Sequence, residues 1–351
     1  MSLYDLAKPF LFVFSPERAH SLAIAALKLG VLPSAEKIHS GVLAQNLWGL
    51  HFPNPIGLAA GFDKNAEVYA PMLKQGFGFV ETGTVTPLPQ PGNEKPRIFR
   101  LKQDQAVINR LGFNNEGLEY YIKQLKKRVK EDGIVGANIG ANKLSDDPIN
   151  DYVIGLGKVL GLADYFTINI SSPNTPGLRA LQGKDALDEL LSKLKSVRDG
   201  IGAKEKPPLL LKIAPDLDER ECEDIAEVIV NHEMEGLIVS NTTLSREGLT
   251  SPFKDEGGGL SGAPLFELST RILSNMYTLT KGKIPLVGVG GVSNGEQAYA
   301  KIKAGASLVQ LYSALVYHGP ALAAKIAAEL EILIKKDGLS NITEAIGLDH
   351  K

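Results

Sequence analysis

Residues 284–313 have the sequence IPLVGVGGVSNGEQAYAKIKAGASLVQLYS. Two short apolar runs, at 285–289 and 307–311, flank a segment with helical periodicity at 294–303. A strand, a helix and a second strand in this order are typical of a βαβ unit in a parallel sheet. The glycines after the first strand either form a tight turn alone or let backbone N–H groups approach a phosphate, whose charge the following helix N-terminus favours. The stretch therefore predicts one unit of an α/β fold with a candidate phosphate loop.

The same alternation extends along the chain from residue 55. Apolar runs predict eight strands, at 56–60, 78–82, 134–138, 164–169, 208–213, 236–240, 285–289 and 307–311. Segments with helical periodicity occur at 65–75, 114–131, 147–161, 184–200, 218–231, 265–280, 294–303 and 320–335. Eight strands, each followed by a helix, favour a (β/α)8 TIM barrel of the α/β class. A doubly wound open sheet is the alternative, but Gly288–Ser293 and Gly155–Gly157 both lack the third glycine of its G-x-G-x-x-G fingerprint.

The N-terminal 44 residues have a different pattern. Apolar residues recur at helical spacing between Leu3 and Phe14, at positions 3, 6, 7, 10, 11 and 14. Ser15 and Pro16 predict the N-cap and first turn of a second helix, which Gly30 ends. Two short apolar helices either cover the barrel floor or form an interfacial or lipophile-binding hairpin. We therefore expect a helical hairpin at 1–44 and a catalytic barrel at 45–351.

Composition limits the kinds of protein this chain can be. The 351 residues carry 38 Lys and Arg against 40 Asp and Glu, so no overall basic field for nucleic acid exists. The single cysteine, Cys222, excludes a disulfide framework and any multi-cysteine metal site within the chain. The six histidines show no metal-ligand spacing, so we expect no metal site. A hydrophobic content of 44% is ordinary for a folded globular protein.

Polar residues follow the predicted strands at one end of the barrel, where TIM-barrel active sites lie. These positions are Asp63, Lys64, Gly83, Thr84, Asn138, Asn169, Ser171, Ser172, Lys212, Ser240, Asn241, Thr242, Gly290, Gly291, Tyr312 and Ser313. Asparagine carboxamides both donate and accept, which suits a planar heterocycle with carbonyl and N–H groups. The two lysines favour ligands that are or become anionic, such as a reduced flavin ring and a carboxylate-bearing substrate. The loops at 171–179 and 241–264 have no regular pattern and are candidate lids or binding loops.

Other functions remain open at this point. A phosphosugar isomerase or an aldolase can use the same barrel, and an aldolase would form a Schiff base on a lysine such as Lys212. A lipophile-binding barrel without catalysis is a third hypothesis. A flavin absorption spectrum separates a flavoenzyme from all of these.

Five motifs resemble the dihydroorotate dehydrogenase family in order along the chain. The most specific is Asn169-Ile170-Ser171-Ser172-Pro173-Asn174-Thr175-Pro176-Gly177, which is similar to the catalytic loop of that family. The others are Ala59-Ala60-Gly61-Phe62-Asp63-Lys64, Asn109-Arg110-Leu111-Gly112-Phe113-Asn114-Asn115, Lys212-Ile213-Ala214-Pro215-Asp216 and Gly288-Val289-Gly290-Gly291. The resemblance extends from about residue 10 to 320. It implies one FMN per chain and the oxidation of dihydroorotate to orotate in pyrimidine (UMP) synthesis.

The resemblance also implies roles for individual residues. It implies that Ser172 is the catalytic base, and that Thr175 and a water beside Phe113 relay the proton. The FMN contacts carried over are Ala59, Ala60, Gly61, Thr84, Asn138, Asn169, Lys212, Ser240, Gly262, Gly291, Tyr312 and Ser313. The pyrimidine contacts are Lys64, Asn109, Arg110, Leu111, Gly112, Phe113, Asn169, Asn174, Asn241 and Thr242.

One residue separates the subclasses of that family. Members that use fumarate or NAD carry a cysteine base in the catalytic loop, whereas the quinone-linked members carry a serine, as at Ser172 here. The N-terminal hairpin also resembles the quinone-linked members, in which it forms a tunnel; His20, Arg97 and Tyr312 match tunnel positions. The resemblance therefore implies a membrane quinone as acceptor and a chain that is a monomer. It further implies peripheral association with the cytoplasmic face of a bacterial cell membrane.

Overall fold

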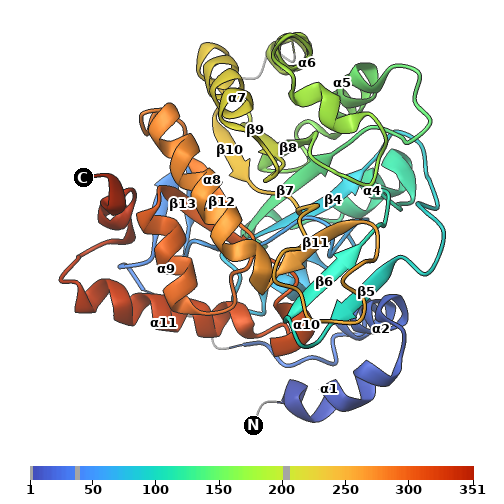
Figure 1. The fold of residues 1–351 in the computed structure, drawn as a ribbon, viewed down its shortest axis with the longest axis vertical. Helices are drawn as coiled ribbons and strands as arrows, with labels where there is room; N and C mark the ends of the chain where they lie inside the picture. The colour runs from blue at the N-terminus through green and yellow to red at the C-terminus, as the bar shows by residue number, and fades with distance from the viewer. Residues whose placement is uncertain (1–2, 36–39, 201–205) are drawn as a thin grey trace.

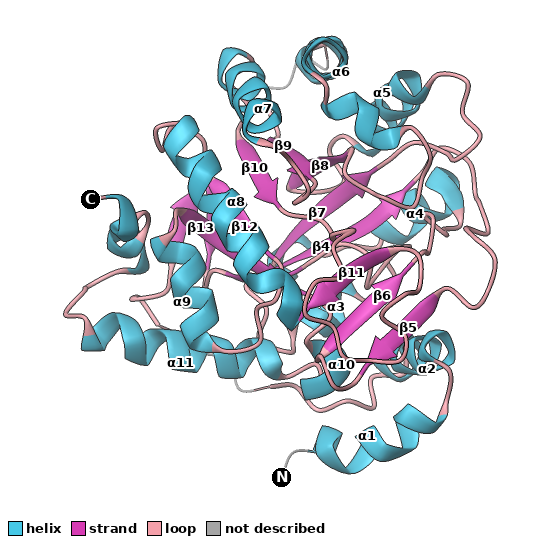
Figure 2. Ribbon diagram, viewed as in Figure 1, coloured by secondary structure: helices cyan, strands magenta, loops and turns pink. Residues whose placement is uncertain are grey.

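Eight parallel strands close into a barrel in this computed structural model, which describes residues 3–35, 40–200 and 206–351. The barrel strands are β3 (Ile56–Leu58), β4 (Phe79–Val85), β7 (Ile134–Ile139), β8 (Tyr165–Asn169), β9 (Leu209–Ile213), β10 (Gly236–Val239), β12 (Leu286–Val289) and β13 (Ala306–Leu311). They are hydrogen-bonded in chain order, and β13 pairs with β3 to close the ring. Figure 2 shows the strands in magenta with the helices around them. The predicted TIM barrel and its eight strands are therefore confirmed, and the open-sheet alternative is wrong.

Helices surround the barrel as an outer layer (Figure 1). They are α3 (Tyr69–Leu73), α4 (Gly117–Leu125), α5 (Pro148–Val159), α6 (Lys184–Asp199), α7 (Glu219–Asn231), α8 (Phe266–Leu279), α9 (Gly295–Lys303), α10 (Leu315–His318) and α11 (Leu322–Lys336). The strands are buried on both faces because these helices cover one face and barrel side chains fill the other. A helix forms within each predicted segment, although α4 ends six residues before the expected residue 131, and α10 is an additional short one.

The helix expected at 65–75 begins only at Tyr69. The Asp63 carboxylate accepts hydrogen bonds from the backbone N–H groups of Glu67 and Val68, at 2.7 and 2.8 Å. These bonds hold residues 63–68 as a loop at the barrel mouth. A local side-chain bond of this kind competes with helix formation, so the helix loses its first turn.

The floor of the barrel is closed by a short antiparallel hairpin, β1 (Gln45–Leu47) and β2 (Leu50–Phe52). Phe52 packs edge-on against Phe79 in the barrel, with ring centroids 5.4 Å apart. The indole of Trp48 donates to the Glu235 carbonyl at 2.6 Å and packs beside Tyr165. Residues 45–52 therefore cover the floor, and the alternative that the N-terminal helices cover it is wrong.

A second sheet lies over the barrel mouth. It contains β5 (Ile98–Leu101), β6 (Ala106–Asn109) and β11 (Gly259–Gly262), all antiparallel and in the order β11-β6-β5. The segment 241–264 was expected to lack regular structure, and β11 corrects that expectation. Its four residues are Gly, Leu, Ser and Gly, which carry little strand propensity of their own. Pairing with β6, more than 150 residues earlier, is what makes them a strand.

The two N-terminal helices are α1 (Leu3–Val13) and α2 (Pro16–Lys28). Figure 1 shows them in dark blue beside β5, β6 and α10. The Arg100 guanidinium donates to the backbone carbonyls of Leu11, Phe12 and Phe14 and so caps the end of α1. Arg97 donates to both carboxylate oxygens of Glu17 in α2. The predicted hairpin therefore exists and is attached to the second sheet at the barrel mouth.

Among the residues that the structure describes, no helix has the length and hydrophobicity needed to cross a membrane.

Candidate active site

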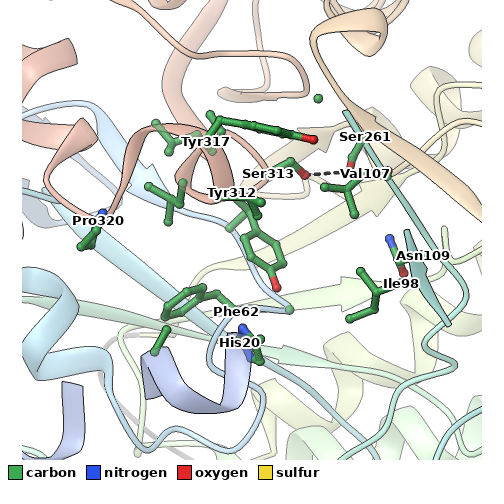
Figure 3. A pocket seen from close by; sticks show the side chains of 18 of the residues that line it. His20, Phe62, Ile98, Val107, Asn109, Ser261, Tyr312, Ser313, Tyr317 and Pro320 are labelled. Carbon is green, nitrogen blue, oxygen red and sulfur yellow. Dashed lines mark hydrogen bonds between the residues drawn. The ribbon is translucent and has the colours of Figure 1, made fainter. Parts of the chain in front are cut away.

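A cavity of about 1020 Å³ joins the mouth of the barrel to the hairpin. Its barrel side is formed by residues that follow β3, β4, β8, β9, β10, β12 and β13, and its other side by α1 and α2. Figure 3 shows His20, Phe62 and Tyr312 on one side of the cavity, with Ile98, Val107 and Asn109 on the other. Most of the predicted polar strand ends therefore share one cavity, to which the hairpin also contributes; Asp63, Gly83, Asn138 and Ser171 do not line it.

Amide and hydroxyl side chains form a connected network at the barrel mouth, which we call the amide rim: Thr84, Asn138, Asn169, Ser171 and Asn241. The Asn169 amide nitrogen donates to Thr84 Oγ1 at 2.9 Å and to Asn138 Oδ1 at 3.2 Å. Its amide oxygen accepts from Ser171 Oγ at 2.9 Å. The Asn241 amide nitrogen donates to Ser171 Oγ at 2.9 Å. Four strands thus share one chain of hydrogen bonds, which fixes the orientation of each amide.

A buried carboxylate, Glu81, holds the amide rim from below. It accepts hydrogen bonds from Asn138 Nδ2 at 2.7 Å and from the side chains of Tyr165, Thr167 and Gln310 at 2.9–3.1 Å. The bond from Asn138 Nδ2 leaves Asn138 Oδ1 to accept from Thr84 Oγ1 at 2.6 Å. Asn138 itself is fully buried and does not line the cavity. Its structural position is therefore that of a support for Asn169 and Thr84.

Lys212 is the cation at the centre of this end of the cavity. It is buried at the end of β9 and lines the cavity, and no described residue accepts a hydrogen bond from its ammonium group. Desolvation lowers the pKa of Lys212, and the negative charge of Glu81 opposes that shift. A buried donor without a partner is costly, so the ammonium group is available to a ligand.

The loop after β8 places Ser172 in the cavity and Thr175 behind it. Ser172 is buried, and its hydroxyl oxygen accepts from the backbone N–H of Asn174 at 3.2 Å. This contact leaves the Ser172 hydroxyl proton free to be donated. Thr175 does not line the cavity, and its buried hydroxyl has no partner among the described residues. The two hydroxyls thus lie in one loop with unused hydrogen-bonding capacity, as a proton relay needs.

Phe113 has a backbone conformation that residues other than glycine rarely adopt. Its φ is 52°, in the left-handed region. Its carbonyl accepts from Asn115 Nδ2 at 2.7 Å and from Gln90 Nε2 at 3.2 Å, and these bonds stabilise the turn. The Phe113 ring lines the cavity together with Asn109, Leu111 and Gly112. Phe113 and Ser172 therefore line the same cavity.

Two titratable groups mark the boundary between the barrel and the hairpin. Burial lowers the pKa of Lys64 to about 8, and the carboxylate of Glu17 opposes the shift. Burial also lowers the pKa of His20 to about 3, with the charge of Lys64 adding to the effect. The His20 ring packs edge-on against Phe62, which packs edge-on against Tyr312. The site therefore has a neutral imidazole on the hairpin side and a lysine that is charged at neutral pH on the barrel side.

The glycine loop after β12 presents backbone donors to the cavity. Gly290 and Gly291 have φ values of 114° and 76°, which favour glycine. No described residue accepts from the N–H groups of Gly290, Gly291 or Ser313, all of which line the cavity. Nearby donors at the start of α9 are already used, because Gly295 N–H donates to Glu329 and Gln297 N–H donates to Asn294. The residues at the start of α9 do not line the cavity, so the backbone donors available to a phosphate there are those of the loop and Ser313.

The predicted site residues divide into two groups. Four of them do not line the cavity: Asn138, Thr175, Arg97 and Arg110. Arg97 is engaged with Glu17 and the carbonyls of Pro91 and Asn93. Arg110 pairs with Glu256 at 2.8 Å and so holds the 241–264 segment. The lining residues are Ala59, Ala60, Gly61, Thr84, Asn169, Lys212, Ser240, Gly262, Gly291, Tyr312, Ser313, Lys64, Asn109, Leu111, Gly112, Phe113, Asn174, Asn241, Thr242, Ser172 and His20.

Sequence reasoning missed three contributors to the site. Glu81 is an acidic residue inside a predicted strand that is otherwise mostly apolar. An acid at a buried strand position is unfavourable unless it has a functional or structural role, so it could have been identified from the sequence. Ser261 in β11 lines the cavity and hydrogen-bonds Ser313 Oγ at 2.7 Å (Figure 3). No local signal predicts it, because its strand depends on pairing with β6. Arg100 caps α1, and its role also follows only from the three-dimensional arrangement.

Known proteins resemble this chain over nearly its whole length. The family model described as Dihydroorotate dehydrogenase matches residues 42–334. A relative from Azorhizobium caulinodans, named Dihydroorotate dehydrogenase (quinone), is 53% identical over 99% of both chains. A relative from Oryza sativa, named Dihydroorotate dehydrogenase (quinone), mitochondrial, is 50% identical over 99% of this chain and 80% of its own length. The crystal structure of DHODH in complex with ferulenol from Eimeria tenella is 42% identical, covers 96% of both chains and superposes with a TM-score of 0.93.

Proposed function

The chain belongs to the dihydroorotate dehydrogenase family, and from that premise we propose how its cavity carries out the reaction. It is an oxidoreductase that converts dihydroorotate to orotate in pyrimidine biosynthesis, with a quinone as electron acceptor. The observation that carries the proposal is the continuity of the cavity from the amide rim to α2. One space with a polar end and an apolar end suits a polar substrate and a lipophilic acceptor.

Dihydroorotate binds at the polar end in this proposal. Its carboxylate pairs with the Lys64 ammonium group, which is charged below a pH of about 8. Its ring amides face Asn109, Asn174 and Asn241, whose carboxamides both donate and accept. Asn174 Nδ2 lies 3.5 Å from Asn109 Oδ1, so the two amides can close around one ring. Arg110 supports this wall from outside through its ion pair with Glu256.

Ser172 accepts the proton that the substrate carbon loses. A serine hydroxyl is a weak base, so it must pass its own proton onward as it accepts one. Thr175 lies in the same loop, and its hydroxyl has no hydrogen-bond partner among the described residues. We therefore assign it as the group that accepts the Ser172 proton. Phe113, which lines the same cavity as Ser172, shields the relay from solvent in this proposal.

The cofactor that fits the barrel mouth is FMN. The residues that would hold its ring are Ala59–Gly61, Thr84, Asn169, Lys212 and Ser240, and those that would hold its phosphate are Gly262, Gly290, Gly291, Tyr312 and Ser313. The fit rests on the unpartnered Lys212 ammonium group and on the free N–H groups of the glycine loop. When bound, FMN supplies a two-electron acceptor beside the substrate. Lys212 presents a positive charge that favours electron uptake, as preorganised charges do in active sites.

The quinone enters through the hairpin in this proposal. The hairpin side of the cavity is lined by Ala7, Leu11, Phe12, Ala19 and Ala23, which offer an apolar wall. His20 and Tyr312 lie where this wall meets the barrel, and Arg97 supports the wall by holding Glu17 of α2. Deeply buried neutral His20 adds no charge to the route.

The outer face of the hairpin supports peripheral membrane association. Leu6, Phe10, Val13 and Leu29 are exposed and do not line the cavity, with Phe10 at 73% and Val13 at 84%. An exposed apolar face beside a lipophile route suits insertion into a lipid interface. We place this face on the cytoplasmic side of a bacterial cell membrane and the chain there as a monomer, with the hairpin at 1–44 as a separate unit from the barrel at 45–351.

Flavin analysis tests this proposal directly. Heat should release FMN from the purified protein at one equivalent per chain, and chromatography distinguishes it from FAD. Anaerobic addition of dihydroorotate to the holoprotein should then bleach the flavin absorption. A colourless protein that takes up no FMN on incubation would overturn the assignment and favour Schiff-base chemistry at Lys212.

A further inference from the structure

A lysine that the proposed reaction does not use is completely buried behind the glycine loop. Lys301 in α9 is 0% exposed, and it forms no ion pair with any residue the structure describes. Its ammonium group donates to Ser269 Oγ at 2.8 Å and to Thr270 Oγ1 at 2.9 Å, and it lies 5.2 Å from the centre of the Phe266 ring. All its partners are neutral and belong to the first turns of α8.

This placement is unfavourable in isolation. Burying a charge that no opposite charge neutralises is expensive, and a helix N-terminus repels a cation. Both effects apply to Lys301: it is buried without an ion pair to any described residue, and its partners lie near the N-terminus of α8. Desolvation lowers the pKa of Lys301 to about 7, with Glu267 opposing the shift. A methionine would fill much of the same volume without these costs, so the lysine needs a compensating anion.

The partners of Lys301 contact the glycine loop. Ser269, which accepts from Lys301, donates to the Gly290 carbonyl at 3.2 Å. A Cβ on Gly290 would meet Ser269 Oγ at 2.7 Å, and a Cβ on Gly291 would meet Phe266 Cα at 2.6 Å. A Cβ on Gly288 would meet Lys301 Cδ at 2.8 Å. The glycine loop therefore packs on Ser269 and Phe266, the partners of Lys301, while Lys301 itself packs against Gly288 of β12; the loop N–H groups have no described partner, and Gly290 and Gly291 line the cavity.

We propose that Lys301 is a positioning residue for the phosphate: from behind the glycine loop it supplies the positive charge that makes this site select a phosphate monoester over an uncharged ligand. The inference rests on the proposed FMN site and deepens it. Lys301 does not touch the ligand; Ser269, Phe266 and the loop stand between them. The positive end of α8 adds to its field. Together they make the loop selective for FMN over riboflavin, which has the same ring without the phosphate.

The test compares two flavins on three full-length proteins. Wild type, Lys301→Met and Lys303→Met are freed of flavin and titrated with FMN and with riboflavin, following quenching of flavin fluorescence. Lys303 is the matched control, because it lies two residues further along α9 and carries the same charge on a partly exposed side chain. We expect Lys301→Met to weaken FMN binding about tenfold, the scale of two charges roughly 10 Å apart in a protein. Riboflavin binding should stay unchanged, and Lys303→Met should alter neither.

The outcomes separate this inference from the function on which it rests. Equal weakening of both flavins would show a merely structural role for Lys301, and unchanged FMN binding would show no role. A wild-type chain that binds neither flavin would instead overturn the proposed function. If Lys301→Met does not fold, Lys301→Gln keeps a donor for both hydroxyls and takes its place. A ³¹P NMR titration of the wild-type holoprotein tests the inference without any substitution. If the second pKa of the bound phosphate stays near 6, its value in solution, the inference is overturned.

Discussion

At the barrel mouth the cavity is walled by side chains that hydrogen-bond one another, whereas at the hairpin it is walled by alkyl and aromatic groups. In the amide rim each carboxamide has its orientation set by two or more partners, from Glu81 through Asn138 to Asn169 and Asn241. On the hairpin, Ala19 and Ala23 contribute only shape. Polar recognition depends on fixed directions, while an apolar route depends on open volume. We therefore expect the two ends to respond to different kinds of substitution.

The largest effect should come from Ser172→Ala at the polar end. Flavin reduction by dihydroorotate should slow by ~10²-fold or more, the usual scale for a lost acid–base group. Anaerobic stopped-flow bleaching of the flavin measures this step apart from quinone chemistry. Orotate binding should be retained, which serves as the control for folding. A reduction rate near that of wild type would show that Ser172 is only a loop residue.

Lys64→Met should act on substrate binding at the same end. Losing a hydrogen bond to a charged group costs about 1.5–3 kcal/mol, so KM for dihydroorotate should rise by roughly tenfold or more. The wild-type KM should also depend on pH. The lowered pKa of about 8 means that the ammonium form is present below that pH and lost as the pH rises through it, so KM should rise above pH 8.

The Lys64→Met variant should lack this rise. Lys74→Met, which removes a charge from an exposed position just beyond α3, is the matched control and should behave as wild type. A wild-type KM that stays flat as the pH rises well past the pKa of Lys64 would contradict the pairing of Lys64 with the substrate carboxylate.

Ala23→Phe should separate the two ends of the cavity. Ala23 lines the hairpin side, so a phenyl ring there fills part of the proposed quinone route. Turnover with a long-tailed quinone should fall by up to about tenfold, the scale of a moderate steric penalty. Flavin bleaching by dihydroorotate and reduction of a small soluble dye should not change. Ala25→Phe, on the exposed side of the same helix, is the control. Equal loss in all three assays would mean that the hairpin only stabilises the barrel.

The smallest effect should come from Phe10→Ser with Val13→Ser on the outer face of α1. Both side chains are exposed, so the fold should be unaffected and binding to lipid vesicles should weaken by a factor of a few. Leu144→Ser, at a position 92% exposed on a barrel loop, removes one exposed apolar side chain elsewhere and serves as the control. Flotation with vesicles compares the two proteins. The same weakening in both would remove α1 as the membrane-facing element.

The sequence predicts most of what depends on local pattern. The eight barrel strands are apolar runs because both their faces are buried, and the helices between them carry one apolar face each. The polar residues after each strand could be assigned to one site, since the carboxyl ends of parallel barrel strands meet at one rim. The motif around Ser172 also indicates the family and its quinone-linked branch, because residue identity within one short loop carries that signal.

The tertiary structure decided what depends on distant partners. β11 is a strand only because β6 lies beside it, so Ser261 could not be placed from its own neighbours in sequence. The helix N-terminus after the glycine loop was expected to favour the charge of a phosphate at that loop, but its Gly295 and Gln297 N–H groups donate to Glu329 and Asn294. The N-terminal helices border the cavity and do not cover the floor, because residues 45–52 close the floor through contacts with distant strands. The sequence placed Lys301 only in a predicted helix. Its complete burial without an ion pair to any residue that the structure describes could not be predicted, because both depend on how the helices pack.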